Sequence, residues 1–264
     1  MGATRLMSGL VPLSIIIALA LALTGCVTET IGGTDLTPDP KAAFERRIGL
    51  ARQYIARGDW ENAERNLDLA VDLDADNAEV YEAFGLLYQS TGELEQAESS
   101  FRRALKVDPK FSRARNNFAV FLMSQNRYAE AERELERVTE DTLYSGRPRA
   151  FINLGTARLR LNDAGGAEAA FGRALRMDRR NPIALLEMGF LALGRGDTTA
   201  AESYYNVYRT VMNRQPPRGL VLGIELSAAK GDKDAQSSYA LALRNLYPDS
   251  PEAKRYAQQQ KPDA

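Results

Sequence analysis

The sequence predicts an all-α fold built from about six helix-turn-helix repeats, followed by a C-terminal capping helix. Three observations support this prediction. Small and aromatic residues recur with a period of about 34 residues from position 42 onward. Glycines stand where the turn inside a repeat is expected, and prolines stand near the ends of several repeats. The two segments ahead of the repeats, an apolar leader and a polar linker, lack this period.

The apolar leader ends at Cys26, the only cysteine of the chain. Residues 1–25 carry a single charge, Arg5, and the apolar run over 10–23 is shorter than the roughly 20 residues of a membrane-spanning helix. Residues 23–26, LTGC, resemble the lipobox of a bacterial lipoprotein. The resemblance implies a signal peptide over 1–25 that is removed, and a diacylglycerol on the Cys26 thiol. An uncleaved membrane anchor with an incidental cysteine is the alternative.

Residues 26–41 are predicted to be the lipidated N-terminus and a flexible linker, because they are rich in Thr, Gly, Pro and Asp. Residues 27–40 reach at most about 45 Å when fully extended. Val27 follows the cysteine, whereas an Asp there usually marks retention in the inner membrane of Gram-negative bacteria. The lipoprotein resemblance therefore implies the outer membrane, with the folded part on its periplasmic face.

Composition argues against several function classes. The chain has 34 Lys and Arg against 35 Asp and Glu, and removal of Arg5 with the leader leaves 33 against 35, a net charge of −2. This balance does not favour nucleic-acid binding. The chain has no histidine, which removes the usual metal ligands and every Ser-His or Cys-His catalytic pair. We therefore expect a non-enzymatic protein with no metal, no small-molecule substrate and no cofactor beyond the lipid on Cys26.

The clearest repeat spans residues 78–111. Gly85 and Ala97 are expected where its two helices cross closely, and Phe101 fills the space beside that crossing. Gly92 is expected to leave the helix at the internal turn, and Pro109 to end the second helix. These residues and their spacing resemble the tetratricopeptide repeat (TPR), which implies a right-handed solenoid. The same frame predicts a TPR region over 42–260, with units at about 44–77, 78–111, 112–147, 148–181, 182–216 and 217–248, and a cap at 251–260.

The first helix of each TPR unit builds the concave face of a solenoid, at positions 2, 5, 9 and 12 of the unit. In units one to three this rule predicts a mixed polar and apolar partner-binding groove for an extended segment or an amphipathic helix. Its predicted residues are Ile48, Arg52, Ile55, Glu79, Glu82, Leu86, Gln89, Arg113, Asn116 and Val120. Among them, Arg52, Glu82, Asn116 and Val120 are the predicted contacts.

Two further features leave alternatives open. In unit five the same positions are all apolar, namely Ile183, Leu186, Phe190 and Leu193, and they fit either a binding face or burial by later helices. The connection over 139–148 is two residues longer than standard. It fits either a kinked link whose Leu143 and Tyr144 cap the core, or a contact point.

Several stretches lie outside the general TPR pattern, including LTGCVT at 23–28, DTLY at 141–144 and LYP at 246–248. With FINLG at 151–155, ALLEM at 184–188 and LGI at 222–224, they resemble the type IV pilus biogenesis and stability lipoproteins of the PilF/PilW family. The resemblance implies a pilotin, which binds the pilus secretin and promotes its localisation and multimer assembly in the outer membrane, for pilus biogenesis and twitching motility. The alternatives are a TPR adaptor lipoprotein that scaffolds peptidoglycan enzymes, and an enzyme with a TPR body.

Overall fold

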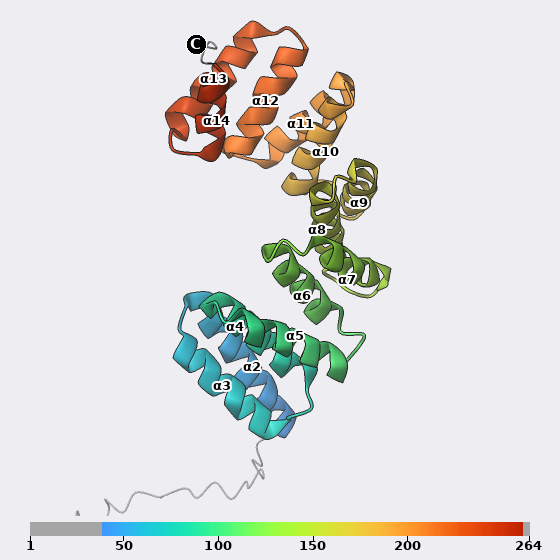
Figure 1. The fold of residues 1–264 in the computed structure, drawn as a ribbon, viewed down its shortest axis with the longest axis vertical. Helices are drawn as coiled ribbons and strands as arrows, with labels where there is room; N and C mark the ends of the chain where they lie inside the picture. Colours follow the sequence, from blue (N-terminus) through green and yellow to red (C-terminus); the bar gives the residue numbers. More distant parts are fainter. Residues whose placement is uncertain (1–38, 261–264) are drawn as a thin grey trace, which may run out of the picture. The chain divides into compact units, whose positions relative to one another are not determined.

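The computed structural model describes residues 39–260, which form thirteen α-helices and no strand (Figure 1). The predicted signal peptide, Cys26 and most of the predicted linker lie outside the described residues. The linker prediction extended through residue 41, whereas the first described helix already begins at Pro40. A proline fits the first turn of a helix because its missing N–H would have no partner there. The described part confirms the predicted all-α repeat fold.

The helices pair in chain order, and each pair corresponds to one repeat. The pairs are α2 (Pro40–Arg57) with α3 (Trp60–Leu73), α4 (Ala78–Thr91) with α5 (Leu94–Val107), α6 (Ser112–Ser124) with α7 (Tyr128–Glu140), α8 (Arg147–Arg160) with α9 (Ala164–Met177), α10 (Pro182–Gly194) with α11 (Thr198–Val211), and α12 (Pro217–Ala229) with α13 (Lys233–Leu246). A last helix, α14 (Pro251–Gln259), packs Ala253 and Tyr256 against Leu220, Ile224 and Leu243 of the sixth pair.

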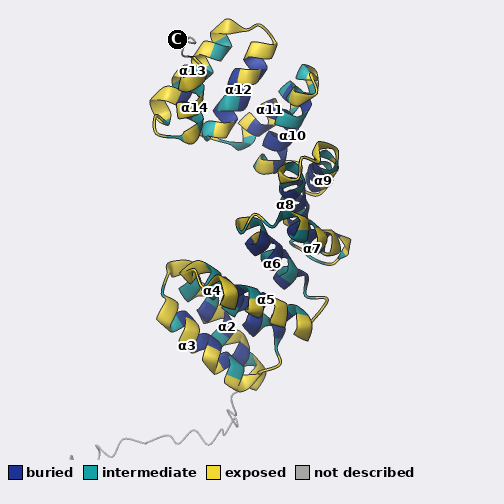
Figure 2. Cartoon of the chain, viewed as in Figure 1, coloured by how far each residue is buried: buried dark blue, intermediate teal, exposed yellow. Residues whose placement is uncertain are grey.

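Small residues allow the two helices of a pair to approach closely, as the sequence predicts. A Cβ placed on Gly85 would lie 2.7 Å from the ring of Phe101, and one on Gly155 would lie 2.7 Å from the ring of Phe171. Both distances are far below van der Waals contact, so only glycine fits at these crossings. Phe101 and Phe171 are fully buried, and the core continues between neighbouring pairs. Figure 2 shows this pattern, with buried residues on the inward sides of the helices and exposed ones at many turns.

The turn inside each repeat needs one residue in the left-handed region of φ. Gly92 adopts φ of 91°, as predicted for the second repeat, and Gly196 adopts 80° in the fifth. In the third and fourth repeats the same task falls to Asn126 and Asn162, with φ of 59° and 62°. Asparagine tolerates this conformation better than other residues with a Cβ. The third repeat therefore keeps the turn although its sequence departs from the pattern.

Candidate partner-binding surface

The ten predicted groove residues divide into an accessible and a buried group. Val120 is exposed, and the half-buried residues are Arg52, Ile55, Glu79, Leu86, Gln89 and Arg113. The buried ones are Ile48, Glu82 and Asn116, all at position 5 of their units. Position 5 is also buried in units four and five, at Ile152 and Leu186. The assignment of this position to an open groove is therefore wrong for this chain.

The burial of position 5 follows from its neighbours. Ile48 belongs to the same core cluster as Val80, Ala83 and Leu87 of the next repeat. The face of α2 that carries Ile48 packs against α4, the first helix of the next repeat, and does not border solvent. Ile48 is consequently a core residue, and sequence reasoning placed it on the groove because the general frame does not distinguish the groove from the contact between repeats.

At Glu82 the same position carries a charge, and the structure surrounds it with donors. The side chain of Glu82 is only 1% exposed. Arg52 of the preceding repeat donates to it over 2.7 Å, and the Asn117 amide donates over 2.6 Å. A carboxylate without such partners would be very unfavourable in this position. Sequence reasoning singled out Arg52 and Glu82 but did not identify their pairing.

Glu79 extends this arrangement toward solvent. It accepts hydrogen bonds from Arg52 over 3.1 Å and from Arg113 over 2.7 Å, so one carboxylate joins three consecutive repeats. Partial burial raises its pKa, but the hydrogen bonds and charges of Arg113 and Arg52 outweigh burial and hold the pKa below the ordinary value of 4.5. We call Arg52, Glu79, Glu82, Arg113 and Asn117 the polar cluster.

Two neighbouring features complete the surface over the first helices of repeats two to four. The Asn153 amide of α8 donates to the side-chain oxygen of the buried Asn116 over 3.1 Å. Between α4 and α6 lies a shallow cleft of about 310 Å³. Its lining residues are Leu86, Gln89, Ser90, Asn117 and Val120. Three of the predicted groove residues thus share one cleft, next to the polar cluster.

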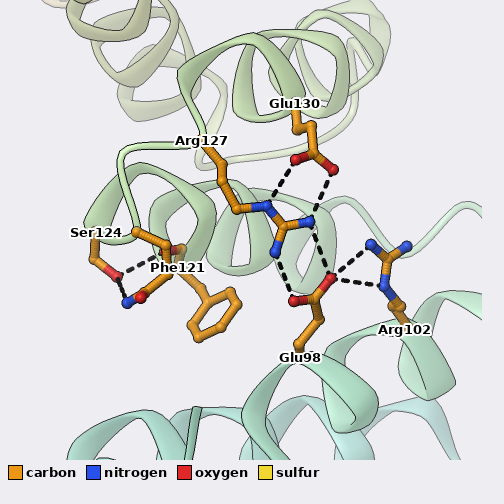
Figure 3. A network of polar contacts seen from close by, with 7 residues as sticks. Glu98, Arg102, Phe121, Ser124, Arg127 and Glu130 are labelled. Atoms are coloured by element: carbon orange, nitrogen blue, oxygen red, sulfur yellow. Dashed lines mark hydrogen bonds and ion pairs between the residues drawn. The ribbon is translucent and has the colours of Figure 1, made fainter. Parts of the chain in front are cut away.

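A second ion network joins the second helices of repeats two and three, away from the predicted groove (Figure 3). Arg127 donates to Glu98 of α5 over 2.6 Å and to Glu130 over 2.7 Å, and Arg102 also donates to Glu98 over 2.6 Å. Hydrogen bonds from Arg127 lower the pKa of both glutamates. These pairs stabilise the contact between repeats. In the sequence, only the four-residue spacing of Glu98 and Arg102 indicated an ion pair in this network.

The long connection between repeats three and four fits the capping prediction for Tyr144 but not for Leu143. The ring of Tyr144 packs against the core, as expected for a cap, and lies over Gly146, where a Cβ would approach the ring atoms within 2.8 Å. Leu143 does not cap the core; its side chain is exposed to solvent. The turn over 141–144 places these adjacent side chains in different environments.

Packing accounts for most of the apolar positions in unit five. Leu186 is buried, and Phe190 and Leu193 pack against the same core cluster. Arg218 of the next repeat lies over the Phe190 ring, 5.2 Å from its centroid, and pairs with Glu187 over 2.6 Å. Only Ile183, at the start of α10, remains exposed. Of the two alternatives for this face, the structure shows burial for Leu186 and partial burial by packing for Phe190 and Leu193.

Within residues 39–260, no group of three or more acidic side chains is placed to hold a metal ion. None of the helices formed by these residues is both long and apolar enough to cross a bilayer.

Comparisons with known proteins agree with the repeat architecture. Two family models, each described as tetratricopeptide repeat, match residues 88–143 and 152–215. The chain is thus a TPR protein, a helical-repeat scaffold with an accessible surface over its first helices. A relative from Haemophilus influenzae, an uncharacterized protein, is 27% identical over half of this chain and 71% of its own length.

Two other comparisons define the family. The type IV pilus assembly protein PilF of Pseudomonas aeruginosa is 34% identical over 92% of this chain and 96% of its own length. A solved structure of Pseudomonas aeruginosa PilF matches with a TM-score of 0.78, covering 84% of this chain and 99% of that one. The crystal structure of PilW, a type IV pilus biogenesis factor, matches at 25% identity with a TM-score of 0.71, covering 81% and 98% of the two chains. The chain belongs to the PilF/PilW family.

Proposed function

We propose that this chain is an outer-membrane lipoprotein pilotin, which binds the type IV pilus secretin and promotes its localisation and assembly into multimers. The observation that carries the proposal is the match to PilF along nearly the full length of both proteins. A role in type IV pilus biogenesis follows from this relationship. The accessible surface over the first helices supports the finer assignment, because TPR surfaces of this kind hold peptide segments.

The proposed mechanism is physical. Acyl chains on Cys26 anchor the chain in the outer membrane, since two or more chains hold a protein stably in a bilayer. The surface formed by the polar cluster and the cleft beside Val120 binds one secretin segment. Anchoring keeps that surface at high effective concentration where the secretin assembles.

The first experiment is deletion of the gene, followed by complementation with the full-length chain. We expect deletion to remove surface pili and heat-stable secretin multimers, and the full chain to restore both. Complementation with Cys26→Ser should yield a folded protein but leave secretin in the inner membrane. Persistence of outer-membrane multimers in the deletion strain would refute the pilotin assignment, and unchanged secretin localisation with Cys26→Ser would show that the lipid is dispensable.

The binding surface is tested with a matched pair of valines. Val120 borders the cleft on α6 and is 39% exposed, while Val107 ends α5 and is 38% exposed. We expect Val120→Lys to reduce multimer assembly and Val107→Lys to leave it unchanged, with both proteins at normal levels. Equal effects of the two substitutions would exclude the cleft as the binding surface.

A further inference from the structure

Leu143 is far more exposed than any other large apolar side chain among the described residues. It is 93% exposed, whereas the remaining exposed apolar side chains range from 37% to 52%. Single apolar residues on a surface are common and need no explanation by themselves. The unusual feature here is that an almost fully exposed leucine stands on an ordered turn.

The hydrogen bonds of Asp141 hold this turn. Its carboxylate accepts from the Ser112 hydroxyl over 2.5 Å and from the Leu143 backbone N–H over 3.0 Å, and its carbonyl accepts from the Tyr144 N–H over 3.3 Å. The Arg147 side chain then donates to the Thr139 carbonyl over 2.7 Å, which links the two sides of the connection. Leu143 is therefore directed outward by an ordered backbone.

Folding does not require leucine at this position. Residue 143 occupies a central position of a turn, where small polar residues are favoured. Its side chain buries almost no surface, so it contributes almost nothing through the hydrophobic effect. Leu143 is therefore free to be covered by another molecule.

A cation without an ion-pair partner lies beside this turn. Arg113 pairs with Glu79, which holds the same place one repeat earlier. Arg149 holds this place one repeat later. Its counterpart in the preceding repeat is therefore Arg113, another cation. Arg149 is exposed and makes no ion pair with any side chain of residues 39–260. Arg149 lies in the first turn of α8, which begins at Arg147, directly after the turn that carries Leu143. Arg149 is therefore available to a carboxylate of a partner.

We propose that Leu143 and Arg149 form an anchor for the secretin segment, which contributes an apolar side chain to Leu143 and a neighbouring carboxylate to Arg149. This inference rests on the proposed function and extends its binding surface from the polar cluster to the connection between repeats three and four. Charge selects the occupant, because an acidic and apolar peptide satisfies both residues. A single exposed leucine offers too little apolar area for stable binding to a bilayer, which favours a peptide as the occupant.

Binding is measured between the full-length chain in detergent and the purified periplasmic region of the secretin. We expect Leu143→Ser and Arg149→Glu each to weaken binding by about tenfold or more, the range of a central interface residue. Matched controls are Leu246→Ser, which changes a leucine that is 50% exposed on α13, and Arg46→Glu, which changes an exposed arginine on α2. Both controls should bind like the wild type.

A photo-crosslinking amino acid at position 143, in cells, identifies the occupant directly. Cross-links to an acidic segment of the secretin, absent when the probe is at position 246, support the anchor. Charge reversal of that acidic residue should restore binding to Arg149→Glu. Normal binding by Leu143→Ser, or cross-links mainly to phospholipid, would overturn the inference while leaving the pilotin assignment intact. If the wild-type chain itself fails to bind secretin, the proposed function is refuted instead, and the anchor with it.

Discussion

The contacts between first helices differ between the two halves of the repeat region. In repeats one to three, Glu82 is buried at position 5 and is held by directional bonds from Arg52 and Asn117. In repeat five the same position is Leu186, which packs in an apolar cluster. An ion pair fixes one relative arrangement of its groups, whereas apolar packing requires only matching volume. Equivalent positions of one repeat frame therefore use different physics.

The largest expected effect tests the apolar half. Leu186→Ala should lower the free energy of unfolding by about 2–5 kcal/mol, because it removes buried apolar contacts and leaves a cavity. Urea unfolding followed by circular dichroism measures this loss. Ile183→Ala, on the exposed side of the same helix, is the control and should stay within about 0.5 kcal/mol of the wild type. Similar losses for the two variants would show that α10 is not packed as described.

The buried charge of the polar half is the second test. Glu82→Gln keeps the shape of the side chain but removes the charge that faces Arg52, and we expect a loss of about 1–3 kcal/mol. Glu79→Gln affects a carboxylate that is 42% exposed, so its loss should be below about 1 kcal/mol. A double-mutant cycle with Arg52→Ala isolates the coupling. Additive effects of Arg52→Ala and Glu82→Gln would mean that the pair makes no specific contribution.

The pH dependence of stability should carry opposite signs in the two halves. The pKa values of Glu79, Glu98 and Glu130 are lowered in the folded state, so their contribution is present above the ordinary value of 4.5 and is lost as pH falls through the lowered values. Burial raises the pKa of Glu225 on α12, so its ionised form is unfavourable in the folded state and destabilises it once the pH exceeds the ordinary value.

Urea midpoints between pH 3 and pH 7 measure these signs. Glu98→Gln should flatten the loss of stability on the acid side, because one carboxylate with a lowered pKa is gone. Glu225→Gln should slightly raise stability at pH 7, because no charge is then desolvated. A lower urea midpoint for Glu225→Gln at pH 7 would contradict the assignment of this carboxylate as an unfavourable one.

The smallest expected effect on stability concerns the turn beside the polar half. Leu143→Ser should change the free energy of unfolding by less than about 0.5 kcal/mol, because the side chain buries almost no surface. By contrast, Gly146→Ala should destabilise the chain, since its Cβ would collide with the Tyr144 ring. Thermal unfolding of the two variants separates them. A large loss for Leu143→Ser would mean that the leucine packs on the protein after all.

The repeat pattern made several local features predictable. Gly85 and Phe101 stand at the crossing and Gly92 stands at the turn, because these tasks depend on size and backbone freedom that a single residue type supplies. The turns at Asn126 and Asn162 were harder to predict from the sequence, because residue types other than glycine can also adopt a positive φ. The candidate surface was only partly predictable. The frame selected Arg52, Glu82 and Val120, but it also selected Ile48, which lies in the core.

By itself, the sequence determined the all-α repeat fold, the turn at Gly92 and the family, because these follow from residue types at regular spacing. It also carries the lipobox that predicts the anchor at Cys26. Only the tertiary structure decided that Glu82 is a buried acceptor for Arg52, that Leu186 is core, and that Leu143 faces solvent while Tyr144 does not. Burial and pairing depend on which neighbouring helix covers a side chain, and that information lies in contacts between repeats rather than within one.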